Sequence, residues 1–180
     1  MRALIVDDER LARNELLRLL EKFPEIEVVG EAANGNEAVE KIEDLSPDLV
    51  FLDIQMPGMN GFEVLEHLHV VPNVIFITAY DEYALKAFEV NALDYVLKPI
   101  EINRLEKAIG KVLLETKETI KEDKLSLESQ IFIKDGEKCW FVKLEKVRMF
   151  ESEGNYVRLY FEESRPMILK SLNNLEKRLS

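Results

Sequence analysis

Short, almost continuous apolar runs alternate with amphipathic stretches through the first two thirds of the chain. A run without polar positions is typical of a strand buried on both faces, as in parallel sheets whose crossover helices cover both sides. The apolar runs occupy residues 3–6, 27–30, 49–52, 74–77 and 95–97. Helical spacing or caps mark the stretches at residues 11–23, 34–45, 62–68, 83–90 and 102–114. Five β-α units in about 115 residues predict an α/β domain with a flavodoxin-like, doubly wound, five-stranded parallel sheet.

Side chains that can handle a phosphoryl group follow four of these five runs. Asp7 and Asp8 come directly after the first run, Asp53 after the third, Thr78 after the fourth and Lys98 after the fifth. The carboxyl ends of parallel strands meet at one edge of a doubly wound sheet, where such folds hold their ligands. Asp53 can accept a phosphoryl group, while Lys98 and the Thr78 hydroxyl can each contact one of its oxygens. The constellation therefore predicts a phosphoryl-transfer site with Asp53 as the acceptor.

A divalent cation is expected at this site, because a carboxylate that attacks phosphorus faces a donor of the same charge sign. Mg²⁺ prefers one or two carboxylates together with waters and phosphate oxygens. We expect Asp8 and Asp53 as direct ligands, the backbone carbonyl of Gln55 as a third, and Asp7 acting through a water molecule. The alternative, in which the acids are solvated strand ends and Lys98 is an ordinary surface lysine, explains each residue alone but not the whole set.

A phosphatase is a competing function for a strand-end aspartate that works with Mg²⁺. Phosphatases of the haloacid-dehalogenase class need a second acid two residues after the nucleophile, to protonate the leaving group. Gln55 occupies that position here. Turnover of small phosphoesters is therefore disfavoured, and we expect a phospho-acceptor rather than an enzyme.

The pattern changes after residue 118. Residues 119–128 are rich in charge and lack Gly and Pro, which fits a charged linker or a solvated extension of the last helix. Beyond them, Asp135-Gly136 suits the positive φ angles of a type I′ hairpin turn. Strands are predicted at residues 131–134, 139–142, 147–150, 156–161 and 167–170, followed by a helix that Ser171 caps. We expect residues 129–180 to form a small, mainly antiparallel β segment that borrows packing from the first domain or from another chain, since about 50 residues bury little core.

Composition agrees with one complete domain and a smaller appendage in 180 residues. Residues 1–120 hold 24 acidic and 12 basic residues, a net charge of −12, whereas residues 121–180 hold 11 acidic and 12 basic residues, a net charge of +1. The first part should repel nucleic acid, and the second need not. No apolar stretch approaches membrane-spanning length, so we expect a soluble cytoplasmic protein. The single cysteine, Cys139, is expected in a core.

The first 118 residues or so resemble the receiver domain of two-component response regulators. The matching motifs are Val6-Asp7-Asp8-Glu9, residues 53–61, Thr78-Ala79 and Lys98-Pro99, in the order and spacing of that family. The resemblance implies that a sensor histidine kinase phosphorylates Asp53, with Mg²⁺ bound, and that the domain assists its own phosphorylation and dephosphorylation.

The same resemblance implies a switch and a pairing surface. Thr78 and Tyr95 would reshape the face made by the fourth helix, fifth strand and fifth helix, and phosphorylated chains would form homodimers through it. The face includes Lys86, Glu89, Asp94 and Arg104.

The rest of the chain resembles one subset of the family in particular. Residues 76–100 look like receivers attached to LytTR-type DNA-binding domains, and residues 147–159 and 171–179 are similar to the first half of such a domain. The resemblance implies transcription regulation, with further strands beyond residue 180 in the family pattern.

The resemblance places one loop of this domain against DNA, so DNA contacts are expected at Asn155, Tyr156 and Arg158, which lie on or beside that loop. The same residues fit a surface turn followed by an amphipathic strand. Because so much of the family's DNA-binding pattern is lacking, we expect weak binding to DNA by these 180 residues. A receiver that signals through protein contacts alone is the alternative.

Overall fold

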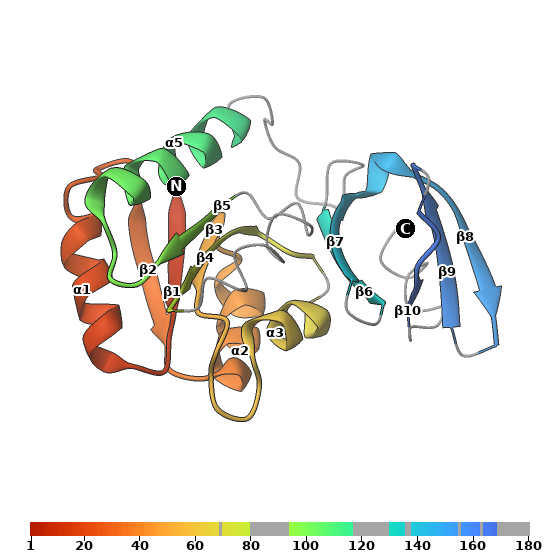
Figure 1. The fold of residues 1–180 in the computed structure, drawn as a ribbon, viewed down its shortest axis with the longest axis horizontal. Coiled ribbons are helices and arrows are strands. Elements are labelled where there is room, and N and C mark those ends of the chain that lie inside the picture. The colour runs from red at the N-terminus through yellow and green to blue at the C-terminus, as the bar shows by residue number, and fades with distance from the viewer. Residues whose placement is uncertain are drawn as a thin grey trace.

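The computed structural model describes residues 1–68, 70–79, 94–116, 130–135, 138–154, 156–162 and 164–168. Within these ranges the first part of the chain forms a five-stranded parallel sheet in the order β2-β1-β3-β4-β5 (Figure 1). The strands are β1 (Arg2–Val6), β2 (Glu27–Ala32), β3 (Leu49–Leu52), β4 (Asn73–Thr78) and β5 (Asp94–Leu97). This order is the flavodoxin-like one, and it confirms the predicted fold class.

Helices cover both faces of the sheet. They are α1 (Arg10–Leu20), α2 (Gly35–Leu45), α3 (Gly61–His67) and α5 (Ile102–Thr116). One buried cluster joins the sheet to α2 and α3, and a second joins the opposite face to α1 and α5. The predicted helix over residues 83–90 lies outside the described residues. None of the helices in the described ranges is long and apolar enough to span a membrane.

Polar side chains set the starts of α2 and α3. Asn34 accepts a hydrogen bond from the Glu37 N–H at 3.0 Å and caps α2. Asn60 and Glu63 form a reciprocal capping box at the start of α3. Helix α1 ends at Leu20, three residues before the predicted end, because tight turns that lead into Pro24 follow it.

The second part of the chain is antiparallel, as predicted. A hairpin joins β6 (Gln130–Asp135) to β7 (Lys138–Lys143), and a separate sheet has the order β10-β9-β8. Its strands are β8 (Val147–Glu153), β9 (Tyr156–Phe161) and β10 (Met167–Ile168), and the 3₁₀ turn η1 (Leu144–Lys146) precedes β8. Gly136 of the predicted turn, Asn155, and the predicted helix from Ser171 lie outside the described residues.

The hairpin has two buried faces. One face packs with β9 in a small cluster of its own. The other face, which carries Phe132, Cys139 and Phe141, belongs to the same buried cluster as α2, α3 and the main sheet. The second part thus shares a core with the first, as expected for a segment of its size, and Cys139 is buried as predicted.

Candidate phosphoryl-transfer site

The predicted residues meet at the carboxyl edge of the parallel sheet. Asp7 and Asp8 follow β1, Asp53 follows β3, Thr78 ends β4 and Lys98 follows β5. Backbone hydrogen bonds fix this alignment: Asp53 N–H donates to the Val6 carbonyl at 2.8 Å, and Lys98 N–H donates to the Thr78 carbonyl at 2.8 Å. Parallel pairing therefore brings residues far apart in the sequence to one place.

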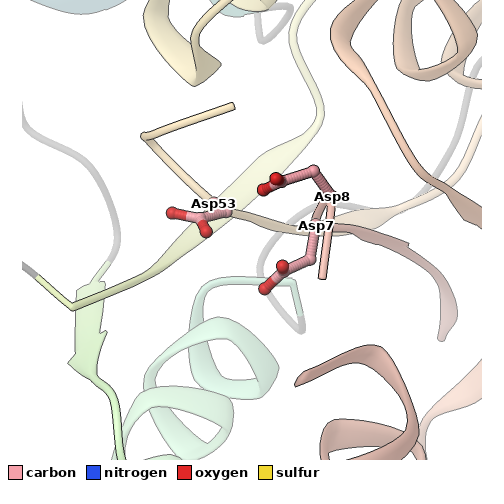
Figure 2. Close-up of side chains that lie close together, drawn as sticks. All are labelled: Asp7, Asp8 and Asp53. Carbon is pink, nitrogen blue, oxygen red and sulfur yellow. The ribbon is translucent and has the colours of Figure 1, made fainter. Parts of the chain in front are cut away.

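Three carboxylates gather at this edge (Figure 2). One oxygen from each of Asp7, Asp8 and Asp53 lies within 4.8 Å of the others. Asp7 and Asp53 are buried, whereas Asp8 is exposed. Carboxylate oxygens are hard ligands, so this donor set suits Mg²⁺ or a similar divalent cation. The cluster contains the three side chains that the sequence predicts as cation ligands.

Lys98 supplies the positive charge that lies among the carboxylates. Its Nζ lies 2.7 Å from Asp7 Oδ2 and 2.8 Å from Asp53 Oδ2. Burial acts to lower the pKa of Lys98, but the hydrogen bonds to Asp53 and Asp7 outweigh it and raise the pKa. Lys98 is therefore charged at neutral pH and held against Asp53, and its contact with a phosphoryl oxygen stays a prediction.

The Asp53 carboxylate is stabilised only in part. Burial raises the pKa of Asp53 even though Lys98 and the Gln55 N–H, which donates to Oδ1 at 3.1 Å, favour its charged form. One ammonium among three carboxylates leaves an excess of negative charge. A bound divalent cation would remove that excess, so the residues fit the predicted metal.

The loop after Asp53 is shaped by glycine. Gly61, the first residue of α3, donates its N–H to the Ile54 carbonyl at 2.9 Å. A Cβ atom at Gly61 would lie 2.5 Å from the Asp53 carbonyl oxygen. Helix α3 thus begins in direct contact with the backbone of Asp53, a constraint that the sequence analysis did not identify.

The two predicted switch residues lie beside the site. Thr78 is fully buried, and Tyr95 on β5 is half-buried against the cluster beneath α2 and α3. The Arg104 guanidinium lies over the Tyr95 ring, 5.3 Å from its centroid. Their role as a switch stays a prediction.

Asp94 and Arg104, two residues of the expected pairing surface, contact each other within the chain. The Asp94 side chain is 1% exposed and forms a two-pronged ion pair with Arg104 of the same chain, one branch at 2.9 Å. Lys111 Nζ lies 3.0 Å from the same carboxylate. The charge of Asp94 is therefore satisfied within the chain, and its place in a pairing surface stays a prediction. Lys86 and Glu89 lie outside the described residues.

The predicted DNA contacts lie on β9, with Asn155 outside the described residues. Arg158 donates to both carboxylate oxygens of Glu153, at 2.8 and 2.9 Å. Tyr156 lies opposite Glu153 across the strand pair, and Arg158 lies opposite Glu151. Acidic neighbours would thus compete with a DNA phosphate for Arg158. The position of Arg158 in the sequence did not indicate this competition.

Residues 3–110 match the family model for the response regulator receiver domain. The chain belongs to this family. It is 37% identical to the sensory transduction protein LytT of Enterococcus faecalis over 185 aligned residues, covering 99% of this chain and 76% of that protein. It is also 50% identical to an uncharacterized response regulatory protein of Vibrio cholerae, over 65% of this chain and 50% of that protein. The chain thus matches about half the length of the Vibrio relative.

A solved structure agrees with this assignment. The response regulatory domain of protein mrkE from Klebsiella pneumoniae is 32% identical, with a TM-score of 0.60 over 66% of this chain and 100% of its own. The match to LytT covers 99% of this chain, so it extends through both the receiver and the antiparallel second part. The resemblance to a response regulator with a LytTR-type output domain is therefore confirmed, whereas the roles of single residues stay predictions.

Proposed function

We propose that this response regulator accepts a phosphoryl group on Asp53 from a sensor histidine kinase in the cytoplasm. The observation that carries the proposal is the position of Lys98, whose ammonium contacts both Asp7 and Asp53 at hydrogen-bonding distance. A cation in that position neutralises the acceptor before transfer and lies within reach of a phosphoryl oxygen after it. The buried, incompletely neutralised carboxylate supplies the nucleophile.

In the transfer, a carboxylate oxygen of Asp53 bonds to phosphorus while the bond from phosphorus to the kinase's histidine nitrogen breaks. The electron pair of that bond stays on the imidazole, and Asp53 becomes an acyl phosphate. Lys98 and the Thr78 hydroxyl hold phosphoryl oxygens. Asp7, Asp8 and Asp53, with the Gln55 carbonyl, would hold Mg²⁺, which neutralises charge on the transferred group.

The same groups assist hydrolysis of the acyl phosphate by water. The chain therefore accelerates its own modification and its own reversal, without acting on a separate substrate. This behaviour differs from that of a phosphatase of the haloacid-dehalogenase class, which needs an acid at the position of Gln55.

For the output segment we propose transcription regulation through DNA contacts at Asn155, Tyr156 and Arg158, with phosphorylated chains acting as homodimers. LytT, with which the chain aligns over almost its full length, supports this assignment. Signalling through protein contacts alone is the second candidate. The ion pair between Arg158 and Glu153 favours this second candidate, because the Glu153 carboxylate occupies the guanidinium that DNA would need.

The proposal is tested by incubating the chain with acetyl phosphate and Mg²⁺ and recording its intact mass. We expect one phosphate on the wild-type chain and none on Asp53→Asn, since the amide has neither the charge nor the nucleophilicity of the carboxylate. Asp44→Asn is the matched control, because Asp44 is an exposed aspartate of α2. It should accept phosphate like the wild type. A base-labile phosphate on Asp53→Asn would refute the assignment of the acceptor.

A further inference from the structure

The hairpin of the output segment packs directly on α3 of the receiver (Figure 1). The Phe62 ring of α3 and the Phe132 ring of β6 are stacked, with centroids 6.3 Å apart and 17° between their planes. Phe132 in turn meets the Phe141 ring of β7 edge-on at 5.2 Å. All three side chains are at most 9% exposed. This is a closed apolar contact, of the kind that stabilises through buried aromatic area.

Polar contacts fix the orientation of the hairpin on the same surface. At one end of β6, the Gln130 carbonyl accepts a hydrogen bond from the Val71 N–H at 3.0 Å. Near the other end, Lys134 Nζ lies 2.8 Å from Glu66 Oε1, an atom that is itself buried. Strand β6 is therefore held at two points, with the aromatic stack between them. We call the receiver surface formed by Phe62, Glu66 and Val71 the α3 face.

The α3 face is connected to the phospho-acceptor by short steps. Its helix begins at Gly61, in contact with the Asp53 carbonyl. The next residue, Phe62, also packs on Phe76 of β4, with ring centroids 5.1 Å apart. Phe76 precedes Thr78 by two residues and points to the same side of the sheet. A displacement of Thr78 toward a phosphoryl group would therefore move the residue on which Phe62 rests.

We propose that the α3 face is the surface on which the receiver holds its own output hairpin, and that phosphorylation of Asp53 releases the hairpin. This inference rests on the proposed function of Asp53. It identifies a second route for the signal, through Phe76, Phe62 and Phe132, which is separate from the face made by β5 and α5. Packed aromatic side chains have few alternative arrangements. A small shift at β4 therefore cannot be absorbed by repacking, and the hairpin separates from the α3 face.

Cys139 provides a measurement of this contact in the intact chain. It is the single cysteine, it is 8% exposed, and it lies in the cluster that the hairpin shares with the receiver. Its rate of alkylation by iodoacetamide, followed by intact mass, therefore reports how often the hairpin leaves the α3 face.

The first arm uses the ion pair that crosses the contact. Glu66→Lys places a second ammonium beside Lys134 and should accelerate alkylation on the order of two- to fivefold, the range of a partly exposed pair. In a Lys134→Glu background the same substitution restores opposite charges and should slow alkylation. Comparing within each background removes the direct effect of residue 134 on the neighbouring thiol.

Glu40→Lys is the matched control, since Glu40 is an exposed glutamate on α2. It should change the rate equally little in both backgrounds. If Glu66→Lys changes the rate in the same direction in both backgrounds, the hairpin does not rest on the α3 face.

The second arm adds beryllofluoride and Mg²⁺, which mimic a phosphoryl group without covalent change. Alkylation of Cys139 should accelerate at least threefold in the wild type and not in Asp53→Asn, an effect of roughly 0.7 kcal/mol on the docking equilibrium at RT of about 0.59 kcal/mol. An unchanged or slower rate in a chain that acetyl phosphate does modify would overturn the release. Failure of acetyl phosphate to modify Asp53 would instead refute the proposed function, and the charge-reversal arm would still decide the docking.

Discussion

Asp53 combines burial, a lysine contact and two neighbouring acids, so at the scale of single residues its charge is a source of instability. Burial raises the pKa of the Asp53 carboxyl despite the Lys98 ammonium at 2.8 Å. We expect Asp53→Asn to raise the free energy of unfolding at neutral pH by about 1 kcal/mol when no divalent cation is present. The raised pKa means that folding disfavours the charged carboxyl, and Lys98 keeps Asp7 as its partner in the variant. Urea denaturation in EDTA measures this difference.

Adding Mg²⁺ should make the wild type more stable to unfolding than Asp53→Asn, the reverse of the order expected in EDTA. The cation binds the folded wild type through the carboxylates and stabilises it by mass action, whereas Asp53→Asn has lost one ligand. Millimolar Mg²⁺ that stabilises both chains equally would show that Asp53 is not part of the metal site. The exposed-site variant Asp44→Asn should behave like the wild type in both buffers.

Two glycines in helices make a second residue-scale comparison. A Cβ at Gly61 would lie 2.5 Å from the Asp53 carbonyl oxygen, whereas a Cβ at Gly110 meets nothing within 4 Å. Gly61→Ala should therefore lower the free energy of unfolding by about 1–3 kcal/mol through overpacking. Gly110→Ala should raise it by up to about 1 kcal/mol through helix propensity. Thermal or urea unfolding of both variants decides the point, and a stable Gly61→Ala would mean that α3 can move away from Asp53 at little cost.

The difference between these glycines also marks a limit of sequence reasoning. Gly61 lies in the motif that suggested the acceptor site, yet neither the motif nor periodicity indicates which backbone atom a methyl group would meet. The shared position of Asp53, Lys98 and Thr78 at one edge of the sheet could be predicted, because each lies at the end of an apolar run. Contacts that depend on how a loop returns to its own strand could not.

Among the elements, β5 and α5 are joined by one buried carboxylate. Asp94 opens β5, and its side chain contacts Arg104 and Lys111 on successive parts of α5. Burial acts to raise the pKa of Asp94, but the hydrogen bonds to Arg104 and Lys111 outweigh it and hold the pKa below its ordinary value of 3.8. The carboxylate thus ties the helix to the edge strand of the sheet.

Asp94→Asn should lower the free energy of unfolding near neutral pH by about 1–3 kcal/mol, the value of hydrogen bonds to a charged group. Because the folded-state pKa is lowered, the wild-type advantage is present above 3.8 and is lost as the pH falls through the lower folded value. Urea unfolding at neutral pH and at a series of pH values below 3.8 tests the sign, because the difference between the two chains should shrink as the pH falls. A difference that stays constant over the series would assign the effect to packing rather than to charge.

Strand and helix positions were largely predictable, because apolar runs and helical spacing are local properties. The pairing of Asp94 with Arg104 was not, since both residues could equally well face solvent on the same surface. Side-chain direction decided between these possibilities, and it is set by tertiary packing. The sequence analysis therefore placed both residues on the surface of β5 and α5 without indicating that they contact each other.

At the scale of the whole molecule, association of two chains is expected to follow phosphorylation. If Thr78 moves toward the phosphoryl group and Tyr95 turns inward, Thr78→Ala should still accept phosphate but should not associate. Thr78→Ser is the control, because it keeps the hydroxyl at this fully buried position. Sedimentation with and without beryllofluoride measures the change, and equal activation-dependent association of Thr78→Ala and wild type would remove Thr78 from the mechanism.

The contact between hairpin and receiver belongs to this largest scale, and the sequence left open whether the receiver or another chain would supply it. The small size of the second part indicated that it needs packing from elsewhere. Nothing in the alternation of Ile131, Phe132 and Ile133 indicates that Phe132 turns to α3 while its neighbours pack with β9. The choice depends on which of two apolar surfaces each face of the hairpin meets.

DNA binding by these 180 residues should be weak and should show little sequence preference. Residues 121–180 have a net charge of only +1, so few phosphates can be neutralised and little counterion release is available. Arg158 also forms an ion pair with Glu153, so a DNA phosphate would have to compete with the Glu153 carboxylate for this guanidinium. Fluorescence anisotropy at near-physiological salt should therefore give micromolar or weaker binding, and Arg158→Ala should change it little. Glu153→Gln should strengthen binding and steepen its salt dependence, since it removes the competing carboxylate. Nanomolar, sequence-selective binding by the wild-type chain would show that the segment is a complete DNA-binding unit and that the ion pair does not limit it.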